Sequence, residues 1–313
     1  MNDAVRRAAE ILRAGGLVAF PTETVYGLGA DACNPSAVAR LYAVKSRPKE
    51  HPVIVHFADA GAAFAWAREV PDAARALAAQ FWPGPLTLIL KRSALAGDFV
   101  TGGQDSVGLR VPSHRVAQEL LREFGGGVAA PSANRFGRIS PTTAAHVRED
   151  LGVEVDLVLE GGASEVGIES TIVDLSGEEP MLLRPGHIRP EAIASVIGRA
   201  PAAKGTGAPR HSGGLERHYA PRTPLHVVAT YALDTEIERR GGRVALLAFA
   251  RADRRVARWI RMPREPVGYA QRLYGALREL DAGHCDAILV ESPPESPEWA
   301  AILDRLRRAA RVG

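Results

Sequence analysis

The stretch VAFPTETVYGLGADA at residues 18–32 organises this sequence. The apolar run from Leu17 to Phe20 predicts a buried strand, and Pro21 ends it because proline cannot donate to a sheet. Polar side chains then follow at once, Thr22, Glu23 and Thr24, before Tyr26 and the turn-favouring glycines Gly27 and Gly29. Open α/β sheets bind ligands beyond the carboxyl ends of their strands, so the stretch indicates a binding site. An ordinary turn, which also favours Thr, Gly and Pro, remains the alternative.

Composition describes an ordinary globular chain. Of its 313 residues, 46% are hydrophobic and 24% charged, and this length suits about two domains. The net charge of +3 fits an anionic ligand such as a nucleotide without requiring nucleic acid. Cys33 and Cys285 lie far apart, which argues against a disulfide framework or a zinc site. Because no window approaches the ~20 apolar residues of a membrane span, we expect a cytoplasmic protein without membrane contact.

Hydrophobic periodicity predicts alternating helices and strands in the first two thirds of the chain. Asn2 or Asp3 can cap the first helix. Predicted helices cover residues 3–14, 35–43, 72–80 (with Trp66 also helical), 112–124 and 143–151, and predicted strands cover 17–20, 52–57, 86–91, 106–111, 128–130, 156–160, 171–174 and 181–184. Residues 97–104 are predicted to be a loop. Consecutive short strands near 171 and 181 predict a partly antiparallel, twisted sheet with flanking helices, and hence an α/β fold.

A change in composition after Ile197 marks a second domain. Residues 200–223 are rich in Gly and Pro and aperiodic, which is typical of a linker. Predicted strands at 225–228, 244–249 and 287–290 then alternate with helices at 269–282 and 297–310, as in a small Rossmann-like domain with a parallel sheet. The domains expected are a catalytic domain at 1–199, a linker or lid at 200–223 and a C-terminal α/β domain at 224–313. The common nucleotide-binding loops and the Gly-x-Ser-x-Gly elbow are missing from the sequence.

Eight short blocks occur in a fixed order: PTETVYGLG (21–29), KSRP (45–48), PVIVH (52–56), WPGPLT (82–87), GLRVP (108–112), PSAN (131–134), ESTIVD (169–174) and LRPG (183–186). In this order they resemble the YrdC-like family of threonylcarbamoyl-AMP synthases over about residues 5–197. The HYAP sequence at 218–221 and the following tail are similar to the long form of that family. The chain has His51 where the family often has Asn, and Ser212-Gly213-Gly214 in place of Ser-Pro-Gly.

The resemblance implies a reaction. ATP, L-threonine and bicarbonate or carbon dioxide give threonylcarbamoyl-AMP and pyrophosphate, and separate transferase machinery places the threonylcarbamoyl group on tRNA. Any contact of this chain with tRNA is therefore expected to be indirect, and direct binding of RNA is left open. Magnesium would accompany ATP, with no protein ligand for it firmly assigned. The attacking carbamate is already anionic, so the protein is expected to supply positioning and charge rather than a nucleophile.

The resemblance also implies roles for particular residues. Lys45 and Arg47 are the expected catalytic cations. The L-threonine ligands it implies are Thr24, His56, Arg110, Ala130 and Ser170. The ATP ligands it implies are Lys45, Arg47, His51, Ser106, Ser132, Asn134, Ser140, Arg184, His218 and Tyr219, the last two as a lid. Tyr26 is expected to line the threonine cleft, and Glu23 is expected to pair with Lys45 or an ion if it lies beside a triphosphate.

Purely structural roles remain alternatives for some of these residues. A surface cation, a core histidine and a structural ion pair are the alternatives for Lys45, His56 and Arg110. For the whole protein, one alternative is a double-stranded RNA-binding module without catalysis, and the small excess of positive charge argues against it. The other is a carbamoyl transferase, but the known ones carry additional acylphosphatase and zinc-finger regions that this chain lacks.

Overall fold

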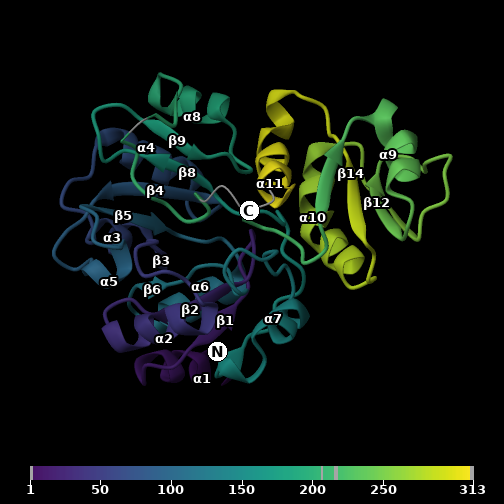
Figure 1. Cartoon of the computed structure of the whole chain (residues 1–313). Coiled ribbons are helices and arrows are strands. Elements are labelled where there is room, and N and C mark those ends of the chain that lie inside the picture. The colour runs from purple at the N-terminus through teal and green to yellow at the C-terminus, as the bar shows by residue number, and fades with distance from the viewer. Residues whose placement is uncertain (1–2, 206, 215–217, 311–313) are drawn as a thin grey trace. The chain divides into compact units, whose positions relative to one another are not determined.

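The computed structural model describes residues 3–205, 207–214 and 218–310. The chain divides into two compact units, one of residues 1–136 and 141–214, the other of residues 137–140 and 215–313 (Figure 1). The expected cap Asn2 lies outside the described residues. Among those residues, no helix has both the length and the apolar character that crossing a membrane requires.

A mixed sheet forms the centre of the first unit. Its order is β10-β9-β8-β4-β5-β3-β6-β2-β1-β7 among the described residues. The strands are β1 (Val18–Phe20), β2 (Gly27–Asp31), β3 (Ile54–His56), β4 (Leu86–Lys91), β5 (Ser106–Arg110), β6 (Val128–Ala129), β7 (Leu157–Val158), β8 (Thr171–Asp174), β9 (Met181–Arg184) and β10 (Ala202–Ala203). β3 runs parallel to β5, whereas β4 is antiparallel to β5 and β1 to β2. The predicted partly antiparallel sheet is confirmed.

Helices pack on both faces of this sheet. They are α1 (Asp3–Arg13), α2 (Pro35–Lys45), α3 (Ala60–Phe64), α4 (Asp72–Phe81), α5 (Asp98–Thr101), α6 (Arg115–Phe124), α7 (Ala144–Leu151) with the 3₁₀ turn η1 (Gly152–Glu154), and α8 (Pro190–Ile197). Alternate residues of a strand point to opposite faces. Val18 and Phe20 therefore join the cluster of α1 and α6, while Ala19 joins the larger cluster that contains α2 and α4. The expected helical Trp66 lies just after α3, in a turn.

The opening stretch departs from its predicted form at the glycines. Gly27 and Gly29 belong to β2 rather than to a turn. The reason is steric, because a Cβ on Gly29 would lie 2.9 Å from both Phe20 and Val128, so glycine is what lets β2 pack beneath the Phe20 ring. The predicted loop at 97–104 likewise contains α5. With only four residues, α5 is too short to leave a helical periodic signal.

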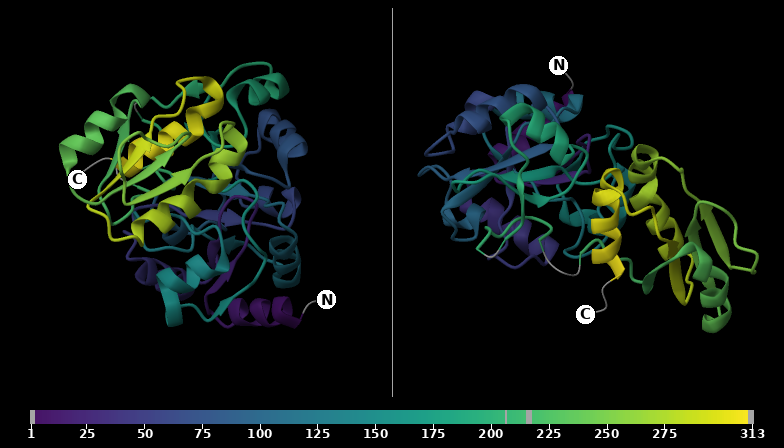
Figure 2. Two further views of the ribbon diagram at one scale, coloured as in Figure 1. Left: turned by 90° about the vertical axis from the view of Figure 1, so that its right-hand side faces the viewer. Right: turned by 90° about the horizontal axis from the view of Figure 1, so that it is seen from above.

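The second unit is a parallel sheet between helices. Its described strands, in the order β11-β14-β12-β13, are β11 (Leu225–Val228), β12 (Val244–Ala248), β13 (Arg258–Arg261) and β14 (Ala287–Glu291). Its helices are η2 (Thr230–Ala232), α9 (Leu233–Arg240), α10 (Pro266–Asp281), η3 (Pro297–Trp299) and α11 (Ala300–Ala310). Figure 2 shows α9 on one face of the sheet and α10 and α11 on the other. The parallel α/β prediction is confirmed; α9 and β13 were not predicted, because both are rich in exposed charged residues.

Candidate functional site

The polar turn after β1 is buried and internally bonded. The Oγ1 atoms of Thr22 and Thr24 lie 2.8 Å apart, and Thr22 Oγ1 also donates to the carbonyl of Val25 at 2.6 Å. Thr22 and Thr24 are 2% and 0% exposed. This local bonding fixes the two hydroxyls at the end of β1. Tyr26 is buried as well, and its hydroxyl donates to the carbonyl of Gly162 at 2.8 Å.

Glu23 pairs with Arg110 rather than with Lys45. Arg110 Nη2 lies 2.6 Å from Glu23 Oε1, and the two side chains are 5% and 4% exposed. The second carboxylate oxygen accepts from the backbone N–H of Ser113 at 3.1 Å. Arg110 ends β5 and Glu23 follows β1, so the pair joins two distant parts of the sheet. The ion-pair alternative for Arg110 is therefore correct as a contact, and it leaves Nη1 of the guanidinium for a further anion.

His56 lies beside Arg110 on the neighbouring strand. The two residues are paired in the parallel register of β3 and β5. His56 is 3% exposed, and its Nδ1 has no hydrogen-bond partner among the described residues. Burial, with a smaller contribution from the Arg110 charge, lowers the pKa of His56 to about 3. A neutral imidazole with one orphaned nitrogen is suited to binding a polar ligand group.

The pKa of His56 predicts a particular pH dependence. Because the folded-state pKa lies below the ordinary 6.5, the unfolded state binds a proton that the native state does not. The contribution of His56 to stability is thus full above about pH 6.5 and falls by about 1.4 kcal/mol per pH unit down to about pH 3. His56→Gln should flatten the pH dependence of the unfolding free energy, measured in urea from pH 4 to 7. Equal slopes for the variant and the wild type would contradict this assignment.

Lys45 ends α2 and turns its ammonium group inward. Nζ donates to the backbone carbonyls of Ser132 and Asn134, and the residue is 1% exposed. Burial, followed by the Arg47 charge, lowers its pKa well below the ordinary value. The surface-cation alternative for Lys45 is wrong, since the side chain is buried against the turn that follows β6.

Arg184, Ser170 and Thr87 form a second bonded group. Arg184 Nε donates to the carbonyl of Ser170 at 2.9 Å, and its Nη2 donates to the Ser170 hydroxyl at 3.0 Å. That hydroxyl lies 2.8 Å from Thr87 Oγ1. Thr87 was not singled out from the sequence, although it closes the WPGPLT block.

The linker residue Ser212 contacts two of the expected phosphate ligands. Its carbonyl accepts from Arg184 Nη1 at 3.0 Å, and its hydroxyl lies 3.4 Å from Arg47 Nη2. Arg47 also donates to the carbonyls of His51 and Pro52, at 3.2 and 2.7 Å. His51 thus contacts Arg47 through its backbone. These contacts bring Arg47 and Arg184 to one place in the first unit.

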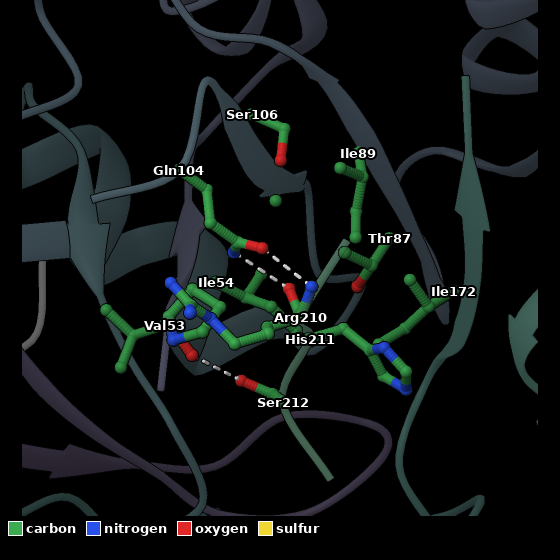
Figure 3. A pocket seen from close by; sticks show the side chains of 12 residues that line it. Val53, Ile54, Thr87, Ile89, Gln104, Ser106, Ile172, Arg210, His211 and Ser212 are labelled. Carbon is green, nitrogen blue, oxygen red and sulfur yellow. Dashed lines mark hydrogen bonds between the residues drawn. The ribbon is translucent and has the colours of Figure 1, made fainter. Parts of the chain in front are cut away.

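Residues 208–212 lie over the face formed by β3, β4, β5 and β8 (Figure 3). The side-chain amide of Gln104 holds them there: it donates to the carbonyl of Arg210 at 3.0 Å and accepts from the Arg210 N–H at 2.6 Å. Ser106, Thr87 and His211 line the cavity beneath, of about 20 Å³. That volume holds about one water molecule, so a nucleotide at this face requires the segment to move. No sequence signal indicated Gln104.

Other expected ligands are placed less directly. Ala130 is buried, and its Cβ lies 3.3 Å from the position that a Cβ on Gly27 would take. Ser132 and Asn134 contact Lys45 through their carbonyls. Ser140, His218 and Tyr219 belong to the second unit, where Tyr219 stacks on Tyr274 with ring centroids 5.8 Å apart. Their roles at the nucleotide stay predictions.

Among the described residues, no group of three or more His, Cys, Asp or Glu side chains lies where it could hold a metal ion. The site instead gathers buried cations, namely Lys45, Arg47, Arg110 and Arg184, beside hydroxyls and a neutral imidazole. Such an arrangement can bind a ligand that carries both phosphate and carboxylate groups.

The chain is similar over nearly its full length to proteins of one family. A family model for Sua5, YciO and YrdC proteins, described as "Telomere recombination", matches residues 10–186, and one described as "Threonylcarbamoyl-AMP synthase, C-terminal domain" matches residues 188–311. Threonylcarbamoyl-AMP synthases from Pyrococcus abyssi and Bacillus subtilis are 38% and 40% identical, over 98% of this chain and 94% and 92% of theirs. A crystal structure of P. abyssi Sua5 complexed with L-threonine is 36% identical, with a TM-score of 0.91 over 98% of this chain and 94% of that chain. The chain therefore belongs to the Sua5/YciO/YrdC family and has the long form, with the C-terminal domain of threonylcarbamoyl-AMP synthases.

Proposed function

We propose that this chain is an enzyme that makes threonylcarbamoyl-AMP and pyrophosphate from ATP, L-threonine and bicarbonate or carbon dioxide. Full-length similarity to threonylcarbamoyl-AMP synthases supports this function. The structural observation that carries it is the buried pair of neighbours Arg110 and His56, together with the buried Thr24 beside Glu23 in sequence. Arg110 offers Nη1 to a carboxylate, and His56 and Thr24 offer neutral partners for the amine and hydroxyl of an amino acid.

The proposed reaction needs binding and charge rather than a protein nucleophile. The threonine amine attacks carbon dioxide and loses a proton, which gives a carbamate. A carbamate oxygen then bonds to the α-phosphorus of ATP, and the bond from that phosphorus to the bridging oxygen breaks, so that pyrophosphate leaves with the electron pair. This makes the chain a nucleotidyltransferase. Lys45, Arg47 and Arg184 are proposed to stabilise the charge on the phosphates.

In this proposal Ser212 leaves Arg47 and Arg184 when the triphosphate binds, because phosphate oxygens are stronger acceptors than a serine hydroxyl or carbonyl. Magnesium fits as an ion carried by the phosphates of ATP, where it would neutralise part of their charge, since hydroxyls rather than clustered carboxylates are the oxygen donors described at the site. The product is proposed to pass to a tRNA-modifying transferase.

The decisive experiment mixes the purified chain with ATP, Mg²⁺, bicarbonate and labelled L-threonine. We expect a threonine-containing AMP adduct and pyrophosphate in equal amounts, and loss of both when bicarbonate and carbon dioxide or Mg²⁺ are removed. Pyrophosphate release without bicarbonate would indicate aminoacyl adenylation instead. Turnover of carbamoyl phosphate would favour a carbamoyl transferase, and tight RNA binding with no adduct would favour a binding module.

A further inference from the structure

An arginine-rich segment of the second unit contains none of the residues of the proposed reaction. Residues 251–264 contain six arginines and one acidic residue, Asp253. The arginines of this arginine segment are Arg251, Arg254, Arg255, Arg258, Arg261 and Arg264, and every one of them is exposed. The segment comprises most of the loop after β12, the edge strand β13 and the turn before α10.

Half of these guanidinium groups have no partner among the residues that the structure describes. Arg254 pairs with Glu238 at 2.7 Å, Arg258 pairs with Glu279 at 2.5 Å, and Arg264 lies over the Phe249 ring at 5.9 Å. The side chains of Arg251, Arg255 and Arg261 form no ion pair or hydrogen bond with any residue that the structure describes. Other acidic groups of α9 are engaged, because Glu236 pairs with Arg239 and Arg240, and Asp234 accepts from the backbone of Arg254. The segment therefore presents uncompensated positive charge.

Protection of a sheet edge explains only part of this pattern. Charged residues on an edge strand discourage pairing with another chain, which accounts for Arg258 and Arg261 on β13. Arg251 and Arg255 lie in the loop before the strand, where no ladder needs protection. Their charge calls for another explanation.

An exposed aromatic residue lies near the same loop. Tyr231, in η2, is 92% exposed. The loop is held against the first turn of α9, three residues beyond Tyr231, by the hydrogen bond of 3.2 Å from the Arg254 N–H to Asp234 Oδ1. η2 follows the carboxyl end of β11, and the loop follows the carboxyl end of β12. Because the strands are parallel, η2 and the loop both start at the end of the sheet where the strands' carboxyl ends lie (Figure 1). Guanidinium forks and an aromatic face thus occur together.

We propose that the arginine segment and Tyr231 form a docking surface for RNA. Guanidinium groups fit phosphate oxygens in a two-point arrangement, and several of them on one segment suit a polymer with repeated phosphates. An exposed tyrosine stacks on an unpaired base, a feature that an acidic protein or an anionic membrane does not offer. This surface lies wholly in the second unit and does not depend on the proposed reaction.

The test measures binding of a labelled, unmodified tRNA transcript to the full chain by fluorescence anisotropy at 50 to 300 mM KCl. Arg251→Gln/Arg255→Gln/Arg261→Gln should weaken binding roughly 10- to 100-fold at low salt and reduce the slope of log affinity against log salt by about 2 to 3, the value for three lost phosphate contacts. Tyr231→Ala should weaken binding about 10-fold with the salt slope unchanged, and should not affect binding of a blunt RNA duplex.

The matched control is Arg7→Gln/Arg122→Gln/Arg199→Gln, three exposed arginines of the first unit with the same change in net charge. We expect it to bind like the wild type. Loss of affinity equal to that of the segment variant would overturn the proposal, as would absence of binding at 100 mM KCl. Equal competition by polyglutamate or anionic vesicles at matched charge would also overturn it, in favour of a general polyanion surface. Adduct formation without RNA should be unchanged in all variants, which separates this result from the proposed function.

Discussion

Arg110→Met is expected to raise the KM for L-threonine by roughly 100-fold, because a charged hydrogen bond to the substrate carboxylate contributes about 1.5–3 kcal/mol. It should also lower the unfolding free energy by about 3–5 kcal/mol, since Glu23 is left as a buried carboxylate without its partner. The KM for ATP should change far less. Urea denaturation and initial rates of adduct formation, with each substrate varied in turn, measure the three quantities.

A double variant separates the structural effect from the substrate effect. Glu23→Gln combined with Arg110→Met removes both buried charges, so most of the lost stability should return while the KM for threonine stays high. Recovery of the wild-type KM in the double variant would show that Arg110 does not bind the carboxylate. Strictly additive losses of stability would show that the two residues are not coupled.

Lys45→Met is expected to lower the rate of adduct formation by roughly 10²–10³-fold, the usual effect of removing one charge-stabilising donor from an active site. It should also destabilise the first unit by about 2–4 kcal/mol, because the carbonyls of the half-buried Ser132 and the buried Asn134 lose their donor. Rates are compared after correction for the folded fraction, which near-ultraviolet circular dichroism provides.

Lys91→Met is the matched control for Lys45. Lys91 ends β4 and pairs with Glu69 at 3.0 Å, but its side chain is 40% exposed. An exposed pair contributes about 1 kcal/mol or less, so stability should change little and the rate not at all. A Lys45 variant whose rate per folded molecule matched that of the control would contradict the proposed role of Lys45.

How accurately the helices and strands could be predicted from the sequence differs between elements, for physical reasons. β4, β8, β9 and β11 were predicted to the residue, because each consists mainly of apolar or β-branched residues. β2 was missed because its glycines read as a turn, and only the ring of Phe20 above Gly29 explains why they form a strand. β13 was missed because an edge strand rich in arginine buries little.

The candidate site shows the same division. The family resemblance carried by the motif blocks implied Lys45, His56, Arg110 and Ser170 as site residues, and the structure places all four in the first unit. Their partners were not predictable. Glu23 and Arg110 are 87 residues apart in sequence, as are Lys45 and Ser132, so the pairing depends on which strands become neighbours.

By itself the sequence determined the α/β class, the family resemblance and the residue types that a phosphate and an amino acid require. These properties depend on local pattern and on chemistry that side chains carry wherever they lie. Only the tertiary structure decided that Glu23 holds Arg110, that His56 is neutral and that Gln104 and Ser212 hold the linker over the sheet. Each of these depends on burial and on contacts between distant segments, which exist only once the sheet order brings them together.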